Sequence, residues 1–166
     1  VILIGHGGKG SVKHDFELSL KVFEALSTKL EENGIPYAYR PHPDSSDDKS
    51  LTKFKLDVSG KQKILSGKPK IFIGFLSSLL YEAHSIGHTS IEIKIRDESV
   101  RLNSQQLNTF VPDYSFYDDQ LNELCQKLSM NHFTEKKEVD KFYSLPLKER
   151  VSLSVSKIEN SIMNKG

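Results

Sequence analysis

Three short segments of this chain carry residue types that can bind an anion or move a proton. They are the glycine-rich stretch His6 to Ser11, the triplet Pro41-His42-Pro43, and the pair Ser77-Ser78 after an apolar run. Glycine lets backbone amides approach an anion closely, and histidine can donate a proton near neutral pH. Serine in the first turn of a helix can cap that helix or donate to a phosphate. Together these residue types indicate phosphate chemistry.

In the first segment, Gly7, Gly8 and Gly10 can present amides to a phosphate, and Lys9 can add a positive charge. The spacing is neither that of a Walker loop nor the full dinucleotide-binding fingerprint. The alternative is a permissive turn followed by an ordinary helix cap.

His42 stands between two prolines, and each proline fixes its own φ and restricts the residue before it. Such rigidity suits a side chain that must point at a ligand. A histidine held in this way can hydrogen-bond a phosphate or protonate a leaving group near neutral pH. The alternative is a surface turn whose histidine packs on Tyr39.

Ser77 and Ser78 follow the most apolar run of the chain and begin a predicted helix. Their hydroxyls can bind a phosphate, or they can serve only as a cap. Glu82 lies one turn later, where it can contact a ribose or face solvent.

Periodicity predicts strands that alternate with helices. Strands are predicted at 1–5, 36–40, 71–75 and 91–95, with a short edge strand at 54–58, and helices at 15–32, 76–86, 118–128 and roughly 136–164. This alternation favours an α/β fold with a Rossmann-like, doubly wound and mostly parallel sheet. Ligands of such sheets bind outside the carboxyl ends of the strands, and each of the three segments directly follows a predicted strand. We therefore expect the three segments to converge on one rim.

Composition limits the remaining possibilities. The length of 166 residues fits a single domain, with 115–166 expected as a helical extension. The net charge of +1 argues against a nucleic-acid partner, and the single cysteine, Cys125, excludes an internal disulfide framework. His84 and His88 have the spacing of a metal pair, but Gly87 should end the helix between them, so no metal site is predicted.

No apolar run approaches the ~20 residues of a membrane-spanning helix.

Tyr39-Arg40-Pro41-His42-Pro43, followed by Ile71 to Ser78, resembles the His-Pro and Ser-Ser (or Ser-Thr) motifs of bacterial sialyltransferases and polysialyltransferases. The resemblance covers about residues 1–96. It implies the C-terminal, donor-binding half of a GT-B fold, with CMP-sialic acid as substrate and no cofactor or required metal. By this resemblance His42 contacts the phosphate and assists departure of CMP, and Pro43 shapes the turn. Ser77 and Ser78 hydrogen-bond the phosphate or the nucleotide.

The short acidic-glycine motif that often carries the catalytic base of these enzymes is absent from the sequence. We expect the base on an N-terminal domain of the same protein, so this chain alone should be inactive. The expected partners are that domain, the nucleotide-sugar donor and a glycan acceptor. The expected location is the cytoplasm, with peripheral association at the inner face of the membrane left open.

Three alternatives stay open at this stage. CDP-activated capsule or teichoic-acid polymerases also carry a His-Pro turn and a Ser-Ser helix start. A Rossmann-like module that binds a phosphate-bearing ligand without chemistry would need the same segments. Half of a nucleotide-sugar epimerase shares the fold but needs an acidic and histidine cluster that we do not find.

Overall fold

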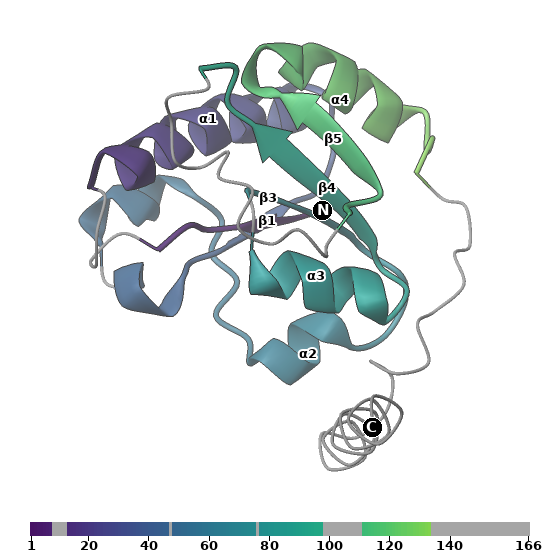
Figure 1. Ribbon diagram of the computed structural model, residues 1–166, viewed down its shortest axis with the longest axis horizontal. Helices are drawn as coiled ribbons and strands as arrows, with labels where there is room; N and C mark the ends of the chain where they lie inside the picture. The colour runs from purple at the N-terminus through teal and green to yellow at the C-terminus, as the bar shows by residue number, and fades with distance from the viewer. Residues whose placement is uncertain (8–12, 47, 76, 98–110, 134–166) are drawn as a thin grey trace, which may run out of the picture.

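A five-stranded, all-parallel sheet forms the centre of the computed structural model, which describes residues 1–7, 13–46, 48–75, 77–97 and 111–133. The strand order is β2-β1-β3-β4-β5 (Figure 1). The bounds are β1 Ile2–Ile4, β2 Ala38–Arg40, β3 Ile71–Gly74, β4 Thr89–Lys94 and β5 Tyr114–Tyr117. Ile2 of β1 pairs with Ala38 on one side and with Phe72 on the other. The predicted α/β, Rossmann-like parallel sheet is confirmed.

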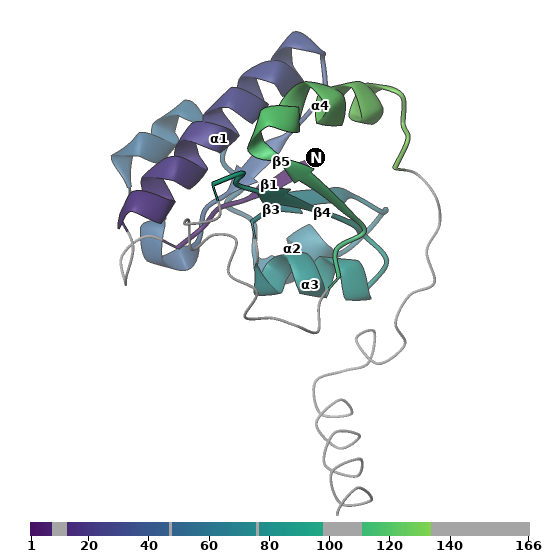
Figure 2. The same cartoon turned by 45° about the horizontal axis from the view of Figure 1, so that its top comes forward.

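Helices cover both faces of this sheet. The described helices are α1 Lys13–Glu32, α2 Lys61–Leu65, α3 Ser78–Ser85 and α4 Leu121–Ser129, with short 3-10 turns at Pro43–Ser45, Lys49–Lys53 and Asp118–Gln120. Figure 2 shows α1 and α4 above the sheet and α2 and α3 below it. Within the described ranges, no helix has the length and apolar character needed to cross a bilayer.

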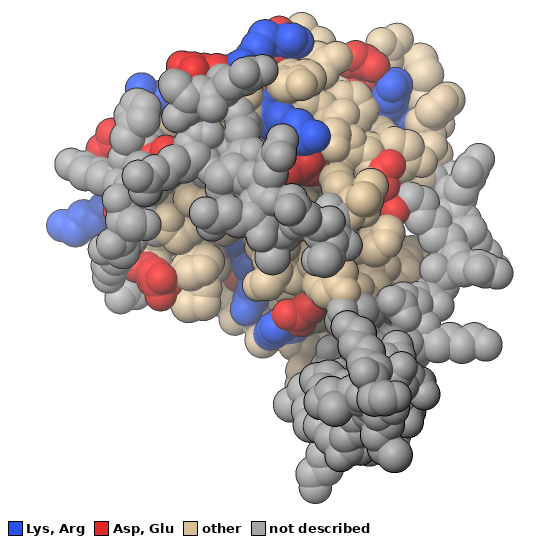
Figure 3. All heavy atoms as spheres, in the orientation of Figure 1, with Lys and Arg blue, Asp and Glu red and all other residues tan. Residues whose placement is uncertain are grey.

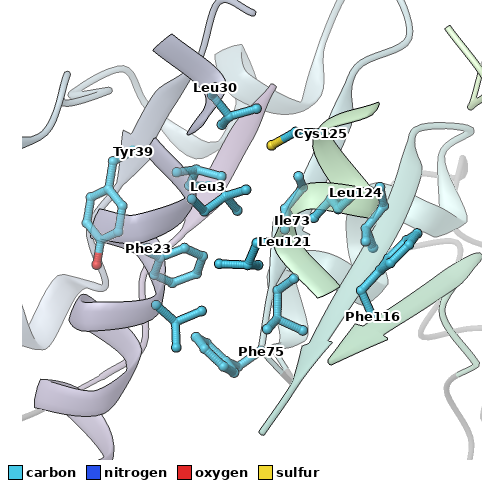
Figure 4. Close-up of a cluster of buried hydrophobic side chains, with 14 of the residues drawn as sticks. Leu3, Phe23, Leu30, Tyr39, Ile73, Phe75, Phe116, Leu121, Leu124 and Cys125 are labelled. Carbon is cyan, nitrogen blue, oxygen red and sulfur yellow. The ribbon is translucent and has the colours of Figure 1, made fainter. Parts of the chain in front are cut away.

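The larger core lies between the sheet and the pair α1 and α4 (Figure 4). Along α1 one apolar face is buried, because its residues recur at helical spacing: Phe16, Leu20, Phe23, Leu26 and Leu30. Cys125 of α4 is buried in the same cluster, and burial raises the pKa of its thiol. A smaller cluster on the opposite face joins Ile4 and Phe72 to α2 and α3.

Three of the described helices end in the same hydrogen-bond pattern, the Schellman motif. After α1, Gly34 adopts φ +66° and donates to Glu31 O, while Ile35 donates to Leu30 O. Gly87 ends α3 in the same way, as its position in the sequence predicts. After α4 the left-handed residue is Asn131, which the sequence analysis did not identify.

The predicted edge strand at 54–58 is wrong in extent, because it forms only an isolated bridge between Leu56 and Tyr39. The bridge consists of two backbone hydrogen bonds. The N–H of Tyr39 donates to Lys55 O, and the carbonyl of Tyr39 accepts the N–H of Asp57. The chain then turns away, because the Asp57 carboxylate accepts the N–H of Ser59 at 2.9 Å.

The expectation of a purely helical extension from residue 115 also needs correction. Residues 115–117 belong to β5, and α4 packs its apolar face on α1, so the segment up to Phe133 is part of the main core. The predicted helix at 118–128 is confirmed as a 3-10 turn followed by α4. The predicted helix at 136–164 lies outside the described residues.

His88 joins three elements on the α2 and α3 side of the sheet. Nδ1 of its ring accepts a hydrogen bond from the backbone N–H of Lys70 at 3.2 Å. Nε2 lies 2.9 Å from Leu65 O. The neutral ring that fits both contacts carries its hydrogen on Nε2. The ring also stacks on Phe72 with 5.1 Å between centroids, and burial lowers the pKa of His88 below 6.5.

This environment predicts a loss of stability in mild acid. Unfolded His88 protonates below about pH 6.5, whereas the folded state keeps the ring neutral to lower pH, so stability is complete above this range and falls as the pH drops. In urea unfolding, the free energy of unfolding should decrease between about pH 7.5 and about pH 5.5. His88→Gln should reduce this decrease, and the exposed control His132→Gln should leave it unchanged. If the free energy of unfolding decreased equally in wild type and in His88→Gln, His88 would not be the source of the acid sensitivity.

Candidate functional site

A pocket of about 580 Å³ lies at the carboxyl ends of β1, β2 and β3. The chain runs from β1 through α1 to β2 on one side, and later returns to β3 on the other side of β1. The connections therefore separate between β1 and β3, and this is where doubly wound sheets bind ligands. All of the predicted site residues that line the pocket come from the three expected segments: Gly7, His42, Pro43, Ser77 and Ser78.

The ring of His42 is held in one tautomer. Its Nδ1 accepts the backbone N–H of Asp44 at 3.2 Å, because His42 caps the 3-10 turn Pro43–Ser45. The Asp44 carboxylate also lies on this side, 3.6 Å from Nδ1. The neutral ring consequently carries its hydrogen on Nε2, which is the nitrogen available to a ligand.

His42 lies against the backbone of Gly7, whereas the ring of Tyr39, its expected partner in the alternative drawn from the sequence, packs on Phe54 and Phe23. A Cβ built on Gly7 would lie 3.0 Å from Nδ1 and 3.1 Å from Cε1 of the ring. Only glycine lets the ring approach this closely. The first segment thus positions the histidine of the second.

Ser77 caps α3 at the opposite wall of the pocket. Its hydroxyl oxygen accepts the N–H of Leu79 at 3.3 Å, and its carbonyl accepts the N–H groups of Leu80 and Tyr81. The cap uses an acceptor of the Ser77 hydroxyl and leaves its hydrogen able to donate. The positive end of the α3 dipole therefore lies at the pocket, beside the hydroxyls of Ser77 and Ser78.

Two cations in the pocket wall were missed by the sequence analysis. Arg40 ends β2, donates through Nη1 to Ser59 O, and lies 3.7 Å from the Asp57 carboxylate. Lys61 begins α2 and donates to the Glu82 carboxylate at 2.7 Å. The position of Arg40 at a strand end, directly before Pro41, was a usable signal. No local pattern marked Lys61.

His6 adds a second imidazole to the pocket. Burial lowers its pKa, the carboxylate of Asp15 opposes that shift, and the neighbouring His42 adds to it. His6 is therefore held in its neutral form near neutral pH. Sequence reasoning named His6 only as part of the glycine-rich loop.

The remaining predicted site residues do not line the pocket or are not described. Glu82 does not line the pocket, and its carboxylate forms an ion pair with Lys61, which does. Gly8, Lys9 and Gly10 lie outside the described residues.

A second cluster of polar side chains lies at the amino ends of β4 and β5. His84 Nδ1 is 2.9 Å from the Asp113 carboxylate and 3.3 Å from the hydroxyl of Ser90. A Ser-His-Asp triad needs the serine on the other ring nitrogen, and Ser90 is fully buried. This cluster joins α3 to the sheet. His84 and His88 face different partners, as expected if Gly87 separates them.

Comparisons with protein families, with curated proteins and with solved structures found no match to this chain. The case for function therefore rests on the geometry of the pocket.

The contact between Gly7 and His42 predicts the effect of one methyl group. Gly7→Ala should displace the imidazole, so the NMR signals of the His42 ring should shift. The free energy of unfolding should change by less than about 1 kcal/mol, because the ring is partly exposed and can move outward. Gly60→Ala is the matched control, since a Cβ there meets nothing within 4 Å. Unchanged His42 ring signals in Gly7→Ala would contradict the packing.

Proposed function

We propose that this chain is the donor-binding domain of a glycosyltransferase that transfers sialic acid from CMP-sialic acid to a glycan in bacterial surface-polysaccharide synthesis. The other half of a GT-B enzyme would supply the acceptor site. Peripheral association with the inner face of the membrane is part of the same proposal.

One observation carries the proposal. His42 and the pair Ser77-Ser78 are far apart in the sequence, yet they line one pocket at the switch point between β1 and β3. A nucleotide phosphate seated there would meet the Nε2–H of His42, the hydroxyls of the two serines and the positive end of α3. His42 is held by its contacts with Asp44 and Gly7, and Ser77 by its cap of α3, so the phosphate would be bound in one orientation.

The chemistry is an inverting transfer in which CMP is the leaving group. The bond between the anomeric carbon and the phosphate oxygen breaks, and its electron pair stays with the phosphate. His42 Nε2–H donates a hydrogen bond to that oxygen as negative charge develops on it. The acceptor hydroxyl bonds to the anomeric carbon, and its proton goes to a base that the family resemblance assigns to the other domain.

Arg40 also supports the proposed donor site, because it places a positive charge on the β2 side of the pocket. Its guanidinium is fixed by Ser59 and Asp57 and is partly exposed. A cation held in this way can stabilise a second anionic group, such as the carboxylate of a sialic acid, without rearranging.

The proposal predicts selective stabilisation by cytidine nucleotides. At a concentration 100 times its Kd, CMP should raise the free energy of unfolding by about 2.7 kcal/mol. UMP, GDP and plain phosphate at matched ionic strength should have smaller effects, and CMP should exceed CDP. The measurement is the thermal transition of the 166-residue chain with each ligand.

Two variants locate the binding site in this assay. His42→Ala should remove most of the CMP shift. Ser77→Asp should do the same, because it keeps a good helix cap but repels the phosphate. His132→Ala is the control, since this residue is exposed at the end of α4. Equal stabilisation by phosphate and by CMP would favour a binding module without chemistry, and CDP exceeding CMP would favour a CDP-dependent polymerase.

A further inference from the structure

We infer that Lys61 is the cation that neutralises the bound phosphate, and that Glu82 positions Lys61 and does not contact the nucleotide. This inference rests on the proposed function for the identity of the ligand, a phosphate monoester of a nucleoside. It assigns a binding role to a residue with no local sequence signal and replaces the ribose contact predicted for Glu82.

The position of Lys61 is determined by a contact between two helices. Its ammonium donates to Glu82 Oε1 at 2.7 Å, while Lys61 itself lines the pocket and Glu82 does not. Glu82 lies four residues after Ser78 on α3, so the two residues share one face of that helix. The ion pair therefore holds the ammonium beside the first turn of α3, where Ser77 and Ser78 line the pocket.

The backbone before Lys61 is fixed as well. Asp57 accepts the N–H of Ser59, and Ser59 O accepts the guanidinium of Arg40. The segment 57–61 thus runs from a cation on β2 to a cation against α3.

An ammonium has three donors, and Glu82 uses one of them. The others can donate to a phosphate at the α3 N-terminus while the ion pair stays intact. Both side chains are partly exposed, at 56% for Lys61 and 30% for Glu82, so the pair needs no repacking to admit a ligand. Glu82 acts through Lys61, which makes it a positioning residue.

The test is titration calorimetry of the full chain with CMP, with cytidine and with inorganic phosphate. Lys61→Met should weaken CMP binding about tenfold or more, the range for one charged hydrogen bond, and should leave cytidine binding unchanged. It should also reduce the dependence of CMP affinity on salt. Lys63→Met, a neighbouring lysine on α2 that does not line the pocket, is the matched control.

Glu82 variants separate positioning from direct contact. Glu82→Gln keeps an oxygen that accepts from Lys61, so CMP affinity should stay within about twofold of wild type, whereas Glu82→Ala should weaken it about as much as Lys61→Met. Reduced cytidine affinity in both Glu82 variants would show a nucleoside contact and overturn the positioning role.

The outcomes distinguish this inference from the proposed function. CMP binding that Lys61→Met leaves unchanged would overturn the inference and leave the proposed function standing. Binding of phosphate that depends on Lys61, without preference for CMP, would support the inference and reject the cytidine donor. A wild-type chain that binds neither CMP nor phosphate would overturn both.

Discussion

The central position of β1 is the constraint on which the rest of the structure depends. It pairs in parallel with β2 on one side and β3 on the other, so the chain must cross the sheet in opposite directions to reach them. Parallel neighbours require crossover connections, and these place α1 on one face and α2 and α3 on the other. The same reversal separates the connections at the carboxyl ends of the strands. The pocket is thus a product of strand order, and the side chains around it determine what it can hold.

Those side chains are fixed before any ligand arrives. Proline restricts the backbone on both sides of His42, Asp44 fixes its tautomer, and Gly7 supports the ring. Arg40 and Lys61 are each paired with a carboxylate, so these two cations add little net charge to the pocket. The surface shows the same balance, with basic and acidic groups interspersed over the described residues of the face in Figure 3. An anion in the pocket would be recognised by local geometry and not by a field of one sign.

Sequence patterns predicted the parts of this structure that depend on neighbouring residues. The apolar runs of β1 and β3, the periodicity of α1 and the glycine that ends α3 are all local signals, and each was assigned correctly. β5 was missed because a four-residue strand with two exposed positions shows little of the alternation that marks a half-buried strand. Lys61 was missed for a different reason. Its role depends on an ion pair with Glu82 on another helix, and pairing across the fold leaves no pattern in the sequence.

The order of the strands also affects the route by which the chain folds. Ile2 meets Ala38 through the β1-α1-β2 unit, but it meets Phe72 only after a much longer loop has closed. The entropy of loop closure favours the shorter unit first, so β3 joins a β1-β2 pair that already exists. Ser77 and Ser78 reach His42 only in that later step. The pocket is therefore completed only after the β1-β2 pair has formed, and a partly folded chain would hold His42 in place before the opposite wall of the pocket exists.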